Sequence, residues 1–375
     1  MTRVKRVLIV GGGVGGMSLA ILLGRAGLEV EIAELDPDWR VYGAGITITG
    51  PTLRAIDQLG LLDRFLAEGH GSEGTLVCDA NGNVVMASRV EGRPLGPRIP
   101  NSGGILRPVL HNILSKATRD AGANVRLGVS VAALNQVNDT VAVEFTDGSF
   151  GDYDLVVGAD GIHSRLRELI FPEAPQPQFT GQGCWRAVLR RPAEIDRARV
   201  FVGGPVKAGV VPVSREEMYL FLLQHAPGNP RMPEAEWPHR LAEQLRGFGG
   251  ILGEIHDGVG AASQINYRPL EKLLVPAPWY RGRVILTGDA AHATTPHLAS
   301  GAGLAIEDAL VLAELLQPGL PLDETLARFM ARRFERCRMV VENSARLGEL
   351  EMAHSPPQQQ AELARASMLA LNAPI

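Results

Sequence analysis

Glycines at three positions near the start of the chain have the spacing of a dinucleotide site. An apolar run over 7–10 leads into Gly11, Gly13 and Gly16, which fill a G-x-G-x-x-G pattern, and a helical pattern follows over 17–25. The first glycine permits a tight turn, the second lets backbone approach a pyrophosphate, and the third lets helix and strand pack closely. The helix N-terminus offers unpaired N–H groups and positive partial charge to the phosphates.

An acidic residue follows at the distance that such a site requires. The strand expected over 29–33 ends at Glu34, about 20 residues beyond the glycines, where an acid commonly binds a ribose hydroxyl. A glycine turn also occurs as a plain strand-to-helix connection. The turn therefore predicts a dinucleotide without saying whether it is NAD, NADP or FAD.

Two further apolar runs each deliver a carboxylate. Residues 153–158 lead to Asp160, followed by Gly161, and residues 284–287 lead through Gly288 to Asp289. In doubly wound folds, buried parallel strands present their C-terminal ends to the ligand. For Asp160 there is an alternative, because an aspartate at this position can instead cap the helix expected to begin at Ser164.

Small residues precede two other elements. The stretch 43–45, Gly-Ala-Gly, leads into a strand at Ile46, and residues this small let backbone lie close to a planar ligand. After Pro296, the stretch 299–301, Ala-Ser-Gly, leads into a helix expected over 302–316. The N-terminus of that helix would face a bound anion.

The composition excludes several classes of protein. The 375 residues are 45% apolar and 21% charged, which is typical of a soluble globular protein, and the net charge of −4 gives no indication of a nucleic-acid partner. Cys78, Cys184 and Cys337 stand in no metal-ligand spacing, so we expect neither a metal site nor a disulfide framework. No signal-peptide pattern and no apolar run long enough for a membrane span is found. We therefore expect a cytoplasmic protein without stable membrane association.

The order of the expected elements indicates an α/β fold. A Rossmann-like nucleotide-binding domain is interleaved with a β-sheet substrate domain, and helices follow at the C-terminal end. The predicted helices cover 17–25, 52–62, 109–121, 164–169, 234–248, 302–316 and 328–351. The predicted division is 1–73, 105–175 and 276–322 for the nucleotide-binding domain, 74–104 and 176–275 for the β-rich domain, and 323–375 for the C-terminal helical segment.

The three motifs together, in this order, resemble a known family. The glycine turn with Glu34, the strand end at Asp160 and the strand end at Asp289 are similar to those of the FAD-dependent aromatic hydroxylases. These are the class A flavoprotein monooxygenases, with a para-hydroxybenzoate hydroxylase-like fold. The resemblance covers most of the chain, about residues 3–350.

The resemblance implies one bound FAD. It assigns Glu34 to the adenosine ribose, Asp289 to the ribityl chain and Arg107 to the phosphate and ribityl region. It also sets the segment from Asp160 to Ser164 near both FAD and a transient nicotinamide cofactor. Motifs and resemblance together predict these FAD-binding residues: Gly11, Gly13, Val14, Gly15, Gly16, Glu34, Gly45, Ile46, Arg107, Asp160, Gly161, Ser164, Gly288, Asp289, Pro296, Ser300, Gly301, Ala302 and Gly303.

The resemblance also implies a reaction. NADH or NADPH reduces the flavin, O2 adds to give a C4a-hydroperoxide, and one oxygen atom passes to a small aromatic or heteroaromatic substrate. The cofactor carries the difficult step, so the protein must bind, orient and exclude water. The chain has no second glycine motif for the nicotinamide donor, which fits a donor that binds only transiently. A monomer or homodimer is expected.

A substrate phenol needs a group that takes up its proton. The candidate pocket residues are His297, Arg186, Tyr219, His225 and Tyr267, of which His297 stands closest to the flavin-facing turn. For each of them, ordinary packing in a strand or loop is the alternative.

One stretch departs from the family pattern, and two other functions stay open. Where the family commonly has Gly-Gln-Gly, this chain has Ala299-Ser300-Gly301, and an alanine disfavours any conformation that requires a positive φ. The alternatives are an FAD-dependent reductase on the same fold and a non-catalytic protein that binds flavin or ligand. A halogenase is disfavoured, because the tryptophans stand in no W-x-W-x-I-P pattern.

Overall fold

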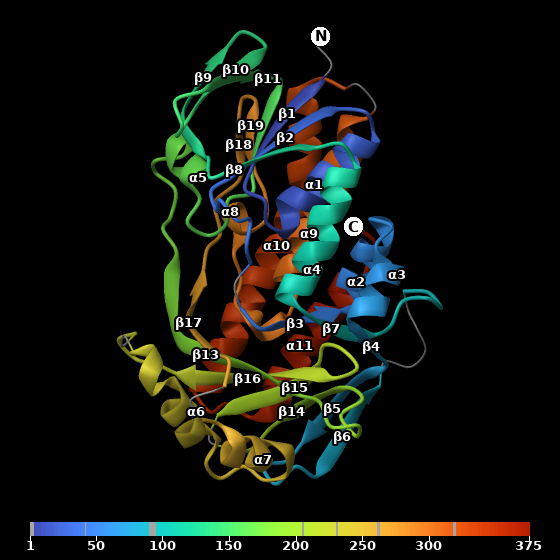
Figure 1. Cartoon of the computed structure of the whole chain (residues 1–375), viewed down its shortest axis with the longest axis vertical. Coiled ribbons are helices and arrows are strands. Elements are labelled where there is room, and N and C mark those ends of the chain that lie inside the picture. The colour runs from blue at the N-terminus through green and yellow to red at the C-terminus, as the bar shows by residue number, and fades with distance from the viewer. Residues whose placement is uncertain are drawn as a thin grey trace.

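The glycine turn follows a central strand of a mainly parallel sheet, at the upper end of Figure 1. The computed structural model describes residues 4–41, 43–89, 95–204, 206–229, 232–260, 263–317 and 320–375. Across this sheet the strands lie in the order β18 (Tyr280–Arg281), β19 (Val284–Leu286), β12 (Leu155–Gly158), β1 (Arg6–Val10), β2 (Glu29–Glu34) and β8 (Asn124–Leu127). β18 runs antiparallel to β19, and the other pairs are parallel.

Both faces of this sheet are covered, which explains its unbroken apolar strands. In β1 the four residues Val7, Leu8, Ile9 and Val10 are at most 1% exposed. One face packs against helices that include α1 (Val14–Arg25) and α9 (Gly301–Leu316), and α4 (Arg107–Asp120) packs against α1. The other face carries an antiparallel sheet of β11 (Phe150–Tyr153), β10 (Thr140–Phe145) and β9 (Val131–Val137), with α5 (Arg165–Ile170) beside β9.

A second large sheet lies at the lower end of Figure 1. Its order is β17 (Ile265–Lys272), β13 (Gln178–Arg190), β16 (Glu217–His225), β15 (Lys207–Pro212), β14 (Ala198–Phe201), β5 (Gly74–Cys78) and β6 (Val84–Arg89). Its outer face packs against α6 (Trp237–Leu245), preceded by η1 (Glu234–Glu236), and α7 (Gly250–Gly258). Its inner face is turned toward the nucleotide-binding half.

A small sheet connects the two halves. It consists of β3 (Gly45–Thr49), β7 (Ser102–Leu106) and β4 (His70–Ser72), and it contacts α2 (Gly50–Gln58), α3 (Leu62–Glu68) and β15. The predicted domain division remains our proposal. All strands of the seven-stranded sheet come from 74–104 and 176–275, whereas β7, which begins inside 74–104, pairs with β3 and β4 instead.

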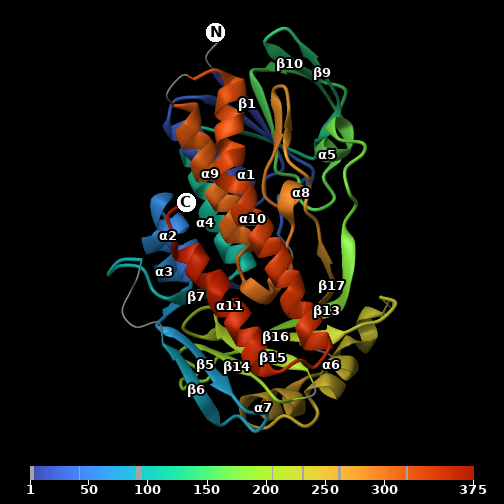
Figure 2. The same ribbon diagram turned by 180° about the vertical axis from the view of Figure 1, so that it is seen from behind.

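One long helix spans both halves. α10 (Leu322–Met352) runs along the molecule from the parallel sheet to the second sheet, with α11 (Pro357–Asn372) against it (Figure 2). Two short helices, α8 (Asp289–His292) and η2 (Pro296–Leu298), lie between β19 and α9. Within the described ranges, no helix has both the length and the apolar character needed to cross a membrane.

Three predicted helices have different boundaries in the structure. The helix expected over 52–62 ends earlier, at Gln58, because Gly60 takes a φ of +72° and ends the helical path of the chain; a separate helix, α3, begins at Leu62. The helix expected over 234–248 ends at Leu245, because glycines at 247 and 250, both with positive φ, separate α6 from α7. The helix expected over 328–351 begins earlier, at Leu322 after Pro321.

Candidate active site

The glycine turn leaves an open space at the N-terminus of α1. Gly11 has a φ of +102°, and a side chain there would collide with the backbone of Ala159 on the neighbouring strand end. A side chain at Gly16 would collide with the Gly11 carbonyl oxygen. At Gly13, by contrast, an added Cβ would meet no atom of the described residues within 4 Å, and none of their side chains caps the helix. The unpaired N–H groups of the first turn therefore face open space, as an anion site requires.

Glu34 holds this turn in place. One carboxylate oxygen accepts a hydrogen bond from the N–H of Gly12 at 2.7 Å, and the other accepts one from the N–H of Asp36 at 2.7 Å. The indole N–H of Trp39 donates to the Gly12 carbonyl at 2.9 Å. Glu34 thus shapes the glycine turn from the end of β2, and its predicted contact with a ribose remains a prediction.

Asp160 is engaged by its own helix. Its carboxylate accepts hydrogen bonds from the Ser164 hydroxyl at 2.5 Å and from the Leu166 N–H at 3.0 Å. Burial raises the pKa of the Asp160 carboxyl, and these hydrogen bonds oppose that rise. The geometry is that of the capping alternative. At Gly161, too, an added Cβ would meet none of the described atoms within 4 Å, so this backbone also faces open space.

Asp289 is left free. Its side chain is exposed, and no hydrogen bond to it is found among the described residues. Although the carboxyl is accessible, the protein around it reduces its contact with bulk water and so raises its pKa, while His292 and Arg107 lower the pKa. The residue before it, Gly288, has a φ of +56° and donates its N–H to Asp308 on α9 at 2.9 Å.

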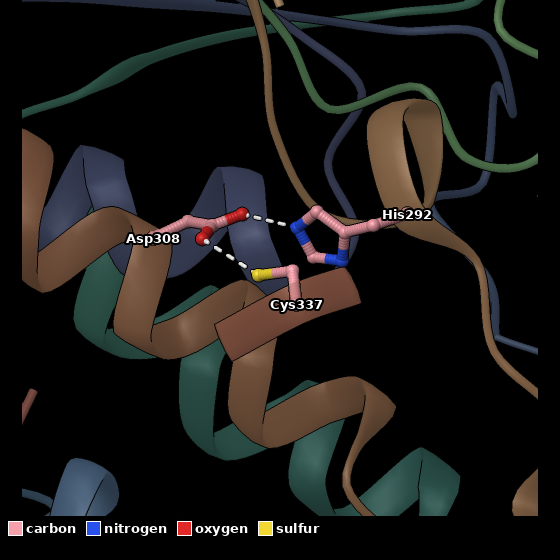
Figure 3. A group of neighbouring side chains, drawn as sticks. All are labelled: His292, Asp308 and Cys337. Atoms are coloured by element: carbon pink, nitrogen blue, oxygen red, sulfur yellow. Dashed lines mark hydrogen bonds and ion pairs between the residues drawn. The ribbon is translucent and has the colours of Figure 1, made fainter. Parts of the chain in front are cut away.

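A buried ion network lies behind this turn (Figure 3). His292 Nε2 lies 2.6 Å from Asp308 Oδ2, and the Cys337 thiol lies 4.0 Å from Asp308 Oδ1. Arg333 donates to Asp308 Oδ1 at 2.7 Å and to Cys337 Sγ at 3.5 Å. Donor atoms of the first three residues lie within 4.8 Å of one another, which is close enough for a metal ion. However, the Arg333 guanidinium already occupies the position of the cation, so we interpret the group as ion pairing.

The network fixes the protonation of its members. Burial alone would lower the pKa of His292, but Cys337 and Asp308 raise it well above its usual value. Burial would raise the pKa of Asp308, but His292 and Arg333 lower it to about 2. Asp308 is therefore a carboxylate that holds Gly288, and with it the position of Asp289.

Charged and phenolic groups gather on the inner face of the second sheet. Burial lowers the pKa of Arg107, and the nearby charge of Arg186 lowers it further, whereas Tyr219 and Asp289 oppose this effect. The Tyr219 hydroxyl makes a short hydrogen bond with Thr47 Oγ1 on β3. Two guanidinium groups, one phenol and one free carboxylate therefore face the same space between the two halves.

The segment before α9 has an unusual backbone. Ala299 takes a left-handed conformation, with a φ of 47°, although an alanine disfavours it. The Ser300 hydroxyl donates to the Leu298 carbonyl at 2.7 Å instead of capping α9, so the N-terminal N–H groups of α9 have no side-chain cap. The substitution of alanine for the family's glycine thus does not prevent the left-handed turn.

Comparison with known proteins decides the family. The family described as "FAD binding domain" matches residues 5–344. The chain is 32% identical to the putative FAD-dependent monooxygenase YetM of Bacillus subtilis, over 94% of this chain and 95% of that protein. It is 34% identical to 2-heptyl-3-hydroxy-4(1H)-quinolone synthase of Pseudomonas aeruginosa (93% and 90%) and 30% identical to the FAD-dependent urate hydroxylase of Klebsiella oxytoca (90% and 88%). This chain belongs to the FAD-dependent monooxygenases.

Solved structures share the fold. Klebsiella pneumoniae HpxO complexed with FAD and uric acid superposes with a TM-score of 0.82 at 24% identity, covering 98% of this chain and 92% of that chain. The tetrameric form of 2-methyl-3-hydroxypyridine-5-carboxylic acid oxygenase gives a TM-score of 0.79 at 24% identity, covering 98% of each chain. At this identity the likeness concerns the fold.

The residues present in this monooxygenase fit FAD. The open side of Gly13 and the uncapped start of α1 suit a pyrophosphate, and the free Asp289 suits ribityl hydroxyls. Val14 begins α1, and Gly15 packs against Ala305 of α9. Gly301, Ala302 and Gly303 form the first turn of α9, where a side chain at Gly303 would collide with Thr52.

Not every predicted residue of the monooxygenase has the expected surroundings. Gly45 is covered by the ring of Tyr219, which a side chain at 45 would strike, so the missing Cβ there makes room for Tyr219. Tyr267 lies on the outer face of the second sheet, with its ring 4.6 Å from that of Trp185, and is not brought together with Arg186. His225 is exposed at the end of β16.

His297 faces α10. Its side chain is fully buried, with Nδ1 2.9 Å from Thr295 Oγ1 and Nε2 3.2 Å from Glu351 Oε2. Lys207 of β15 completes the chain of contacts, at 2.5 Å from Glu351 Oε1. Burial would raise the pKa of Glu351, but His297 and Lys207 lower it to about 2. His297 therefore connects the flavin-facing segment to α10 and to the second sheet.

The sequence reasoning missed Thr47, Gln182, Lys207, Asp308 and Glu351. Apart from Gln182, whose Oε1 is unpaired among the described residues, each meets a partner that lies far away in the sequence. The one available signal was the charged residue at an otherwise apolar helix position, Asp308 in α9.

Proposed function

We propose that this chain is an NADH- or NADPH-consuming monooxygenase that adds one oxygen atom to a small, planar aromatic or heteroaromatic compound with an acidic hydroxyl or ring N–H. The observation that carries the proposal is the group formed by Arg107, Arg186 and Tyr219 opposite the free Asp289. Two guanidinium groups near one carboxylate leave a net positive charge, which stabilises the anion of an ionised substrate.

The chemistry of oxygen transfer belongs to the cofactor. When bound, FAD supplies hydride acceptance from the nicotinamide and activation of O2. The chain's own residues bind and orient: Arg186 and Arg107 favour the deprotonated substrate, whose ring is then more electron-rich. Burial raises the pKa of Tyr219, and Thr47, Arg186 and Arg107 oppose the rise, so Tyr219 remains a neutral hydrogen-bonding partner at pH 7.

The relatives support this substrate class. The names of two of them concern a quinolone and urate, which are planar heteroaromatic compounds with ring N–H groups. The nicotinamide donor is proposed to bind transiently, because the sequence offers one glycine motif. A monomer or homodimer in the cytoplasm also remains a prediction.

The proposal is tested with purified, yellow holoenzyme. A panel of hydroxypyridines, hydroxyquinolines and hydroxypurines is scored for stimulated NADH and NADPH oxidation, with hydrogen peroxide measured in parallel to detect uncoupling. We expect at least one product heavier by one oxygen atom. Stimulated oxidation that yields only peroxide with every compound, or a reduced product without added oxygen, would contradict the proposal. Arg186→Met should lower kcat/KM for that substrate while flavin content is unchanged.

A further inference from the structure

Two adjoining cavities lie between α10 and the strands that cross from one half to the other. Their volumes are about 230 Å³ and about 400 Å³, and both are lined by Gln178, Lys272, Ala345 and Glu349. They therefore form one groove, which we call the α10 groove. Figure 2 shows α10 running beside β13 and β17 in this region.

The groove has a buried polar inner end. Gln182, His297 and Thr295 line the smaller cavity. Gln182 is 3% exposed, and its Oε1 has no hydrogen-bond partner in the part of the chain that the structure describes. His297 Nε2 lies 3.2 Å from Glu351 Oε2 at the same end of the groove. Buried polar atoms are normally paired, so an unpaired acceptor at the end of a groove indicates a position for a hydrogen-bond donor.

The inner end continues toward the proposed substrate site. Alternate residues of a strand point to the same face, so Gln182, Cys184 and Arg186 form one row on β13, with successive members about 7 Å apart. Burial raises the pKa of Cys184 and Arg186 lowers it, and both residues lie near enough to Arg107 to shift its pKa. A molecule bound at Gln182 would therefore lie two positions along this row from Arg186, with Cys184 between them.

The outer part of the groove carries both signs of charge. Lys272 and Arg346 contribute positive charge, and Glu342 and Glu349 contribute negative charge, with Arg346 and Glu349 paired at 2.9 Å. A dinucleotide with its pyrophosphate would require a net positive surface. A volume of about 400 Å³ suits a small ring compound.

We propose that the α10 groove is a passage through which a planar aromatic molecule with an N–H or O–H donor reaches the inner face of the second sheet, with the Gln182 side-chain oxygen as its first acceptor. The inference rests on the proposed function for the nature of the molecule. The existence of the passage does not depend on turnover.

The passage is tested first without a substrate. Gln182→Cys sets a thiol at the inner end, and 4,4′-dithiodipyridine, a planar aromatic disulfide, reports its reaction by releasing 4-thiopyridone, with mass spectrometry locating the label. The native cysteines are at most 1% exposed, which keeps the background low. We expect the Q182C holoenzyme to be labelled at position 182, and the labelling to slow at least ten-fold when Ala345→Phe or Lys272→Phe is added to Q182C.

The control is Ala327→Phe added to Q182C, at an exposed position of the same helix. It should leave the labelling rate unchanged. Flavin absorbance verifies that each variant is folded, and Lys272→Phe approaches from the opposite wall in case Ala345→Phe does not fold. No labelling of Q182C, or equal labelling rates in all variants, would overturn the passage.

The second arm uses 4-hydroxyquinoline and any compound that stimulates NADH or NADPH oxidation, with binding followed by stopped-flow flavin absorbance. Ala345→Phe should slow association and dissociation by the same factor, and Gln182→Leu, which removes an acceptor along the passage and not in the substrate site, should also change both rates by one common factor. If nothing stimulates oxidation, the proposed function fails while the labelling result still decides the passage. If oxidation is stimulated but Ala345→Phe changes neither rate, the passage fails and the function stands.

Discussion

Two strand ends of the same sheet, β12 and β19, are alike in sequence and different in structure. Each is a short apolar strand followed by an aspartate, Asp160 or Asp289. Asp160 turns back on its own helix and fills its hydrogen bonds with Ser164 and Leu166. Asp289 makes no hydrogen bond among the described residues, because its turn is held from behind, through Gly288 and Asp308.

The difference teaches how a strand-end carboxylate becomes available to a ligand. At β12 the aspartate itself stabilises the turn. At β19 the turn is stabilised instead by the buried carboxylate of Asp308 on α9, so the carboxylate of Asp289 stays free. The following changes separate the two arrangements, beginning with the largest expected effect.

Asp308→Ala should lower the free energy of unfolding by about 3–5 kcal/mol, because it leaves His292 as a buried charge without its carboxylate and leaves Arg333 with Glu307 as its one remaining ion-pair partner among the described residues. Urea unfolding measures it. Arg338→Ala, which removes exposed ion pairs on the same helix as Arg333, is the control and should leave the midpoint nearly unchanged. Equal effects of the two variants would mean that the network does not support the β19 turn.

Asp289→Asn should weaken FAD binding about 10–100-fold, since a hydrogen bond to a charged group contributes about 1.5–3 kcal/mol. Titration of apoprotein with FAD, followed by flavin fluorescence, measures it. Asp160→Asn is the matched variant, with the same change at the other strand end, and should alter FAD affinity much less. Similar losses of FAD affinity in the two variants would show that Asp160 and Asp289 do not differ in their availability to the ligand.

Lowering the pH should destabilise the turn after β19 before it destabilises the turn after β12. The pKa of Asp308 is lowered to about 2. Its ionised carboxylate therefore contributes about 2 kcal/mol to the free energy of unfolding, which is fully present above about pH 4 and is lost as the pH falls toward 2. The pKa of Asp160 is raised, so its protonation in acid removes no such contribution. Unfolding free energies between pH 5 and pH 2 should fall less steeply in Asp308→Asn than in the unchanged chain, and Asp160→Asn should keep the full slope.

Asp160→Ala should lower the free energy of unfolding by about 1 kcal/mol, the usual contribution of a cap, because the Leu166 N–H loses its acceptor. Thermal unfolding of the apoprotein measures the loss. An unchanged stability together with a large loss of FAD affinity would reverse the roles assigned to Asp160 and Asp289.

Ala299→Gly should raise the free energy of unfolding by less than about 1 kcal/mol. Glycine removes the cost of the left-handed conformation, about 1–2 kcal/mol, but loses more chain entropy on folding. Denaturant unfolding of the holoenzyme measures the gain. A loss of stability would show that the Ala299 methyl group contributes packing that outweighs its backbone strain.

The sequence predicted the family, the α/β class, the glycine turn and the strand ends well, because these depend on local patterns. Gly11 and Gly16 need no distant information, since their spacing already describes the turn. The boundaries of α2 and α6 were less accurate, because Gly60 and Gly247 end helices whose apolar pattern continues beyond them.

The rest depends on which elements face each other. Arg186 and Tyr267 stand at similar positions in neighbouring strands, and only the register of β13 with β17 shows that they occupy opposite faces. Likewise, His297 was predicted from its place before the turn, and the last helix was predicted to end at Glu351, but the sequence did not show that these two residues meet. Lys207 and Thr47 were invisible for the same reason.

The pairing of β12 with β19 has a consequence for how the molecule is made. Val156 pairs with Val284, and the whole seven-stranded sheet except β5 and β6 is encoded between them. During synthesis the ribosome must therefore finish the second sheet before the strand that carries Asp289 can join the first. We expect the nascent chain to hold an incomplete flavin site, with β12 as a temporary sheet edge, until its last quarter has emerged.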